Sequence, residues 1–262
     1  QWLLGHPLAH IHVGCRPVFL LFLLQFFFNN FLFFDEIAQL KEELQVWEEA
    51  HAEDFSGVIG QLDDITGPVY RDVGEKDWYA SYVSSLTEWD IVSGFKDSDG
   101  KFTGQYKPGN NVTIAEVLKM SMRAAGVDET NCVTSPENVA ATSHWAGKFV
   151  SCAEEMDVRL FRDPYLELNK HAKRAEMLTV IHDAFGDEVL PMYATFNDTS
   201  GHTYEADIAY ATVFGIVSGD TNSNGVEVGT FRPDDYINRA ETAKIIFHRM
   251  KEEVRKEVAL SE

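Results

Sequence analysis

An Asx-rich stretch at residues 220–225 has the spacing of a cation-binding loop. Asp220, Asn222 and Asn224 alternate along the chain and a glycine follows, which is the opening pattern of a calcium loop, where alternate side-chain oxygens face one ion. The twelfth position, which carries a bidentate Glu in such loops, is Phe231 here. An ordinary Asx-rich turn is therefore the favoured interpretation. Ca²⁺ bound by these three residues is the alternative, and it is the one cofactor that the sequence suggests.

Cysteine chemistry leaves two alternatives open. The three cysteines, at positions 15, 132 and 152, form no C-x-x-C pair and make no zinc site by themselves. Cys132 and Cys152 can pair if the compartment is oxidising. Two buried free thiols are an equally good interpretation, because free cysteine is among the most buried residue types.

Catalytic motifs are absent from the sequence. It contains no G-x-S-x-G elbow, no P-loop, no H-E-x-x-H and no dinucleotide glycine pattern, so we expect no enzyme. With 42 acidic against 22 basic residues the formal net charge is -20, which repels phosphate backbones. Nucleic acid is therefore excluded as an expected partner. A cation, or a polymer recognised by a few local basic groups, fits better.

The first 34 residues differ in composition from the rest of the chain. Residues 18–34 carry no charge and are mostly Phe and Leu. A membrane-spanning helix needs about 17–25 apolar residues, so this run lies at the lower limit. We expect segment 1–34 to contain a membrane anchor, with apolar packing inside an oligomer as the alternative.

Residues 35–65 have the pattern of an amphipathic helical stalk. Apolar side chains recur at alternating spacings of three and four, flanked by Glu and Lys. The stalk is expected either to self-associate or to dock on the domain that follows. The residues of its apolar stripe are Ile37, Leu40, Leu44, Trp47 and His51.

An internal repeat dominates the remaining chain. The tetrapeptide Ile-Val-Ser-Gly occurs at residues 91–94 and again at 216–219, an offset of 125 residues. An Ala-Glu pair follows each glycine 22 residues later, ending at Glu116 and Glu241. Matches at this density indicate a repeat architecture.

A third, more divergent copy lies between these two. Trp78 matches Trp145 at an offset of 67 residues, and this copy closes on an Ala-Glu pair that ends at Glu176. The predicted units are residues 66–127, 128–188 and 189–255.

Each unit is predicted to form a helix, a loop and a second helix. Gly94 and Gly219 are expected to end the first helix in a left-handed conformation. Thr113 is expected to cap the second helix of the first unit in a capping box with Glu116, and Asn238 to cap its counterpart in the third unit. One such unit cannot bury both helix faces, whereas three can, so we predict a mainly α fold built from three stacked units.

The order of motifs resembles the S-layer homology family. An acidic turn is followed by Trp and an aromatic residue, an Ile-Val-x-Gly stop, Phe-x-Pro and an x-Arg-Ala-Glu helix start. The resemblance implies a pseudo-threefold arrangement with a central helix bundle, on an exported protein of the prokaryotic cell envelope. It also implies grooves between units that bind anionic, often pyruvylated, cell-wall polysaccharide. The residues that carry it are Asp72, Trp78, Tyr79, Ile91–Gly94, Phe231–Pro233 and Asn238–Glu241.

The resemblance implies that the arginine of this motif contacts the carboxylate of the polymer. This arginine is not present in all three units. The third unit has Arg239 and the second has Arg174, but the first has Ile114 at this place. The tryptophan is present in two units and is replaced by Thr203 in the third. We therefore expect unequal grooves, with these polymer-binding residues: Arg239, Arg174, Gly219, Gly94, Trp78 and Trp145.

The sequence thus predicts a non-catalytic module that anchors a protein to the cell wall. The alternative is a self-assembling surface-layer or filament subunit whose N-terminal helix drives assembly. A third interpretation is an anchor separated from a larger protein that carries a catalytic domain.

Overall fold

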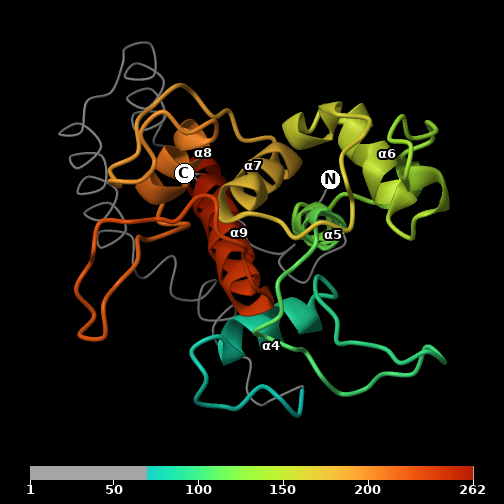
Figure 1. Cartoon of the computed structure of the whole chain (residues 1–262), viewed down its shortest axis with the longest axis horizontal. Helices are drawn as coiled ribbons and strands as arrows, with labels where there is room; N and C mark the ends of the chain where they lie inside the picture. Colours follow the sequence, from blue (N-terminus) through green and yellow to red (C-terminus); the bar gives the residue numbers. More distant parts are fainter. Residues whose placement is uncertain (1–69, 262) are drawn as a thin grey trace.

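The computed structural model describes residues 70–261 (Figure 1), and the fold is mainly α, as predicted. The predicted membrane segment 1–34, the whole of the predicted stalk 35–65 and residues 66–69 lie outside the described residues. Within residues 70–261 no helix combines the length and the apolar character needed to cross a membrane.

Between residues 70 and 261, six α-helices alternate with loops as three pairs. The loops contain three short 3-10 helices, all in the middle of the chain. The α-helices are α4 (Ala80–Glu88), α5 (Ile114–Ala124), α6 (Gly147–Glu155), α7 (Arg174–Phe185), α8 (Glu205–Val213) and α9 (Arg239–Ser261), and the 3-10 helices are η2 (Glu129–Asn131), η3 (Ala141–Ser143) and η4 (Arg159–Arg162). One pair falls in each of the three predicted units, although α9 runs beyond the predicted end at 255.

The first helix of each pair packs on the second helix of another pair. α4 packs against α9, α6 against α5 and α8 against α7. Figure 1 shows α9 running through the middle of the molecule, with α4 lying across one of its ends. Each unit therefore completes the packing of a neighbour, and the first unit closes on the third.

A ring of three backbone hydrogen bonds joins the units at the start of the second helices. The amide of Val112 donates to the carbonyl of Ile237 at 3.0 Å, that of Ile237 to Ala172 at 3.1 Å, and that of Ala172 back to Val112 at 2.9 Å. These residues occupy the same position in their units, two residues before α5, α7 and α9. The closed ring supports the predicted pseudo-threefold arrangement.

The helix starts are also bonded across units. The first amide of each second helix donates to a carbonyl in the loop of a neighbouring unit. The pairs are Ile114 with Lys170 (3.0 Å), Arg174 with Asp235 (2.9 Å) and Arg239 with Asn110 (2.9 Å). Because the chain itself satisfies these amides, they are not available to a ligand.

The predicted caps of α5 and α9 are confirmed. The Glu116 amide donates to Thr113 Oγ1 at 3.2 Å, and the Thr113 amide donates to Glu116 Oε2 at 2.8 Å, which completes a capping box. Asn238 and Glu241 make the same reciprocal pair at 2.9 and 3.1 Å. The Ala-Glu motif thus has a structural role at both helix starts.

The prediction that Gly94 and Gly219 terminate helices is wrong. α4 ends at Glu88, and the left-handed residue after it is Asp90, with φ 55°. In the third unit the left-handed residue after α8 is Gly215, with φ 67°. The helices therefore end six residues before the motif's glycine, and the left-handed residue lies four residues before it.

Close packing explains why glycine occurs at these two positions. A Cβ on Gly94 would lie 2.5 Å from the ring of Tyr70, and a Cβ on Gly219 would lie 2.5 Å from the ring of Phe196. Each glycine lets an aromatic ring from the start of its own unit lie against the chain. The glycine of the tetrapeptide thus allows close packing of an aromatic ring and does not cap a helix.

Candidate functional site

The acidic residue at the start of a unit fixes the loop before the second helix. The Asp72 carboxylate accepts the amides of Tyr106 and Lys107, both at 2.8 Å. Lys107 precedes a proline and has φ 58°, a conformation that is costly for a residue other than glycine. Two charge-assisted hydrogen bonds stabilise this turn. Asp198 repeats the arrangement with Phe231 (2.9 Å) and Arg232 (2.7 Å).

Arg239 is buried between the third and first units. Its Nε–H donates to the Tyr106 carbonyl at 2.8 Å, and its Nη2 donates to the Ser93 carbonyl at 2.9 Å. The guanidinium also lies over the Tyr106 ring, 4.4 Å from the ring centre, and its Nη1 is 3.5 Å from Glu116 Oε1. The residue is only 5% exposed. These contacts make Arg239 a link between two units.

Arg174 makes the corresponding link between the second and third units. Its Nε–H donates to the Phe231 carbonyl at 2.9 Å, its Nη1 is 3.3 Å from Glu241 Oε1, and its guanidinium lies over the Phe231 ring. It is 7% exposed, and burial lowers its pKa. Both predicted arginines are therefore largely enclosed by protein.

A hollow of about 530 Å³ lies beside Arg239, and we call it the first groove. One wall is the chain at residues 91–96, which includes Gly94, and the other is the outer face of α5. The second unit contributes Trp145, which is 55% exposed. The structure thus brings Gly94, Trp145 and Arg239, three of the predicted site residues, to one place.

The sequence analysis missed two basic residues of the first groove, the exposed Lys96 and Lys119. Lys119 is the more enclosed of the two. It is half-buried on α5, and within residues 70–256 its ammonium has no hydrogen bond and no ion pair. Burial, together with the nearby cations Arg123 and Lys96, lowers the pKa of Lys119. A desolvated cation without a carboxylate partner is an unsatisfied charge, and an anion placed in the groove would neutralise it.

A second hollow, of about 540 Å³, lies in the third unit and is called the second groove. It is lined by residues 212–219, including Gly219, and by the α9 side chains Lys244, His248 and Arg255. Burial and the neighbouring cations Lys244, Lys251 and Arg255 lower the pKa of His248 to about 4. The low value reflects burial in a locally positive field, although the chain as a whole is strongly negative.

Lys244 in the second groove corresponds to Lys119 in the first. Each lysine stands three residues after a capping glutamate, Glu241 or Glu116. The Lys244 ammonium lies 6.0 Å from the ring centre of Trp78, which is 56% exposed. Among the described residues it has no hydrogen bond and no ion pair. An exposed tryptophan therefore lines the first groove with Lys119, and another lies near Lys244, outside the lining of the second groove.

The joint between the second and third units has different chemistry. The place of the lysine is taken by Thr179, which is fully buried. Arg159 contributes a cation there, but its Nη2 lies 2.8 Å from Asp183 and 2.6 Å from Asp207. Burial would raise the pKa of Asp207, yet hydrogen bonds from His182 and Arg159 outweigh burial and lower it. This joint is closed by internal ion pairs.

The residues predicted to bind calcium lie at the tip of a hairpin and hydrogen-bond within it. Arg232 donates to both carboxylate oxygens of Asp220, at 2.8 and 2.9 Å, and this hydrogen bonding lowers the pKa of Asp220. The side-chain oxygen of Asn222 accepts the amides of Asn224 and Val226 at 2.9 and 3.1 Å, which is an Asx turn. Calcium binding stays a prediction, and an ion at this place would compete with Arg232 for Asp220.

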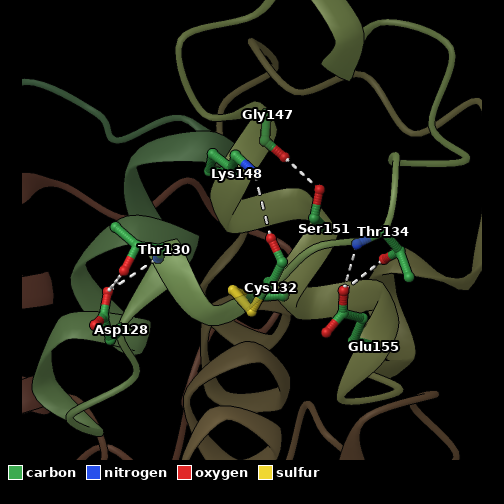
Figure 2. Close-up of a disulfide and its surroundings, with 9 residues drawn as sticks. Asp128, Thr130, Cys132, Thr134, Gly147, Lys148, Ser151 and Glu155 are labelled. Carbon is green, nitrogen blue, oxygen red and sulfur yellow. Dashed lines mark hydrogen bonds between the residues drawn. A yellow bond between two sulfur atoms is a disulfide. The ribbon is translucent and has the colours of Figure 1, made fainter.

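Cys132 and Cys152 form a disulfide, with their Cα atoms 5.2 Å apart (Figure 2). The bond ties the loop after η2 to the middle of α6. Beside it, Glu155 accepts hydrogen bonds from the amide and hydroxyl of Thr134 at 2.8 and 2.6 Å. The same helix starts two residues after Trp145, so the disulfide braces the helix that directly follows this groove residue.

Lys119 and Lys244 could have been found from the repeat register. They differ by the same 125 residues that separate the two Ile-Val-Ser-Gly motifs. The burial of Arg174 and Arg239 had no such signal, because it depends on carbonyls and rings that lie far away in the sequence.

Comparisons with known proteins point to one family. The chain is 28% identical over 157 residues to the cell surface glycoprotein 1 of Acetivibrio thermocellus, which covers 55% of this chain and 6% of that protein. It is 28% identical over 116 residues to the middle cell wall protein of Brevibacillus brevis, covering 44% of this chain and 9% of the relative. It is 39% identical over 59 residues to the surface layer protein of Brevibacillus choshinensis, covering 22% and 5%.

The chain thus spans less than a tenth of the length of these relatives. The aligned part of the first is nevertheless longer than any single predicted unit. The third unit gives the most specific match, because residues 195–243 fit the profile of the S-layer homology domain. This segment runs from the start of the second groove, through α8 and the hairpin, to the first turn of α9. Residues 195–243 of this chain are therefore similar to the S-layer homology domain.

Proposed function

We propose that this chain anchors its protein to the cell wall by holding an anionic wall polysaccharide in the first and second grooves. One observation carries the proposal: a half-buried lysine, which has no anionic partner among the described residues, lines each groove, and an exposed tryptophan lies in the first groove (Trp145) or near the lysine of the second (Trp78). The net charge of the chain is -20, so two local sites of positive charge stand out against a negative surface. A polymer with spaced negative charges fits this arrangement.

The chemistry of the grooves suits a charged sugar. The exposed ring faces of Trp78 and Trp145 offer flat apolar surface to the face of a pyranose, and a lysine beside each can meet an acidic substituent. From the resemblance to the S-layer homology family, we propose that the polymer is a secondary cell-wall polysaccharide that carries pyruvate groups. All three units, including the divergent second one, are part of the proposed module.

A location at the prokaryotic cell surface follows from the S-layer homology domain and is consistent with the names of the relatives. The Cys132–Cys152 disulfide is also compatible with export, since disulfides persist in oxidising compartments. The grooves and the core account for the features that recur between the repeats, so the role that we propose is attachment.

Co-sedimentation with purified cell-wall sacculi tests the proposal. The full chain is mixed with native sacculi and with sacculi from which the anionic polymer has been removed by acid extraction. We expect saturable binding to the native sacculi and a loss of at least about tenfold in affinity for the stripped ones. Equal binding to both preparations, or no binding to native sacculi, would refute the proposed function.

A further inference from the structure

The arginines Arg239 and Arg174 differ from the lysines Lys119 and Lys244 in how the protein holds their charged groups. Arg239 donates to two backbone carbonyls and lies against two aromatic rings, Phe95 and Tyr106, at 4.9 and 4.4 Å. Arg174 is held in the same way by the third unit. Each guanidinium is thus anchored by two hydrogen bonds and by ring contacts. Because Arg239 is 5% exposed and Arg174 is 7% exposed, little surface of either residue is open to a polymer.

The lysines have the opposite character. Lys119 and Lys244 reach into the grooves from α5 and α9, and within the described residues neither ammonium is hydrogen-bonded or ion-paired. Most other cations near the grooves do have anionic partners, such as Arg123 with Asp90 at 3.3 Å. An unpaired, half-buried ammonium is the group in these grooves with the most to gain from a bound anion.

A comparison within the molecule supports the role of the lysines. Where the lysine position is Thr179, the matching tryptophan position is Thr203, so both groups are missing from the same joint. The arginine, by contrast, is absent at Ile114 in the unit where α5 still supplies Lys119. Lysine and tryptophan thus occur together as pairs, Lys119 with Trp145 and Lys244 with Trp78.

We infer that Lys119 and Lys244 bind the negative charge of the polymer, and that Arg174 and Arg239 are positioning residues that hold neighbouring units together. The inference rests on the proposed function and assigns the roles within it. The ligand class is a pyranose with a single acidic substituent, which sits between an ammonium and an indole face. Each chain then has two such sites, because the third joint lacks both the lysine and the tryptophan.

Binding to native sacculi at increasing salt separates the two roles. The lysine double variant K119M/K244M is compared with a matched control, K76M/K101M, which removes the same charge outside both grooves. We expect the lysine double variant to lose about tenfold or more in affinity, to lose most of its salt dependence between about 50 and 500 mM NaCl, and to keep its melting temperature. The control is expected to bind like the wild type, and K119R/K244R to recover most of the affinity.

The arginines are tested by R239K and R174K, single changes that keep the charge but not the planar guanidinium. We expect a lower melting temperature, with salt-dependent binding retained by the folded protein. The inference is overturned if K119M/K244M binds native sacculi with wild-type affinity and salt dependence, or if the arginine variants lose binding without a change in melting temperature. If the wild-type chain fails to bind native sacculi, the proposed function itself is wrong.

Discussion

The Nε–H of Arg239 donates to the carbonyl oxygen of Tyr106 at 2.8 Å, and this bond joins two residues that are 133 positions apart. It connects the start of the last long helix to the loop of the first unit. The closed set of backbone hydrogen bonds among Val112, Ala172 and Ile237 also joins these two units. A chain whose first and last units are bonded in this way is expected to unfold as one body and not unit by unit.

The two motif glycines give the first test of the packing. We expect G94A and G219A each to lower the free energy of unfolding by about 1–3 kcal/mol, because a methyl group would lie 2.5 Å from an aromatic ring that is packed in place. Urea denaturation measures the effect. G109A is the matched control, since a Cβ at Gly109 meets nothing within 4 Å. If G94A were as stable as G109A, close packing would not be the reason for glycine.

The disulfide gives a second test. Cys132 and Cys152 are separated by 20 residues, and closing a loop of this size stabilises a protein by about 3 kcal/mol. We expect C132A/C152A to lose a free energy of unfolding of that order, measured by urea denaturation without reductant. Adding reductant should destabilise the wild type and leave the variant unchanged. Equal stability of the variant and the oxidised wild type would show that the bond contributes nothing.

A buried carboxyl on α9 predicts a pH dependence of stability. Burial raises the pKa of Glu252 to about 7, against an ordinary value near 4.5. The folded state therefore holds a proton that the unfolded state has released, so this contribution is complete below about pH 4.5 and is lost as the pH rises through 7. We expect the wild type to lose stability between pH 5 and pH 8, and E252Q to lose less. The free energy of unfolding at the two pH values checks this, and an equal loss in both proteins would rule it out.

Much of the helical architecture could be predicted from the sequence. The 125-residue offset places the helix starts of α5 and α9, and the pairing of Thr113 with Glu116 is a local pattern that needs no knowledge of the fold. Caps form between residues three positions apart, so they can be read from spacing alone.

The contacts between units could not be predicted in this way. Gly94 was expected to cap a helix, because nothing in its neighbourhood shows that the Tyr70 ring packs on it. Arg239 was expected to contact the polymer, and its burial could not be foreseen because the carbonyls that bind it belong to another unit. Both features depend on tertiary contacts, which a local pattern does not encode. The lysines were missed for a different reason, since the repeat register contains them and only their lack of a partner reveals their role.

The occupation of the two grooves can be observed directly by the indole N–H signals of the tryptophans in NMR spectra. The chain is titrated with soluble fragments of the anionic wall polymer. We expect the signals of Trp78 and Trp145 to shift together, and that of Trp89, which stacks on Phe247 with 6.3 Å between ring centres, to stay in place. Binding of the fragments with no shift at Trp78 and Trp145 would show that the polymer is held elsewhere on the molecule.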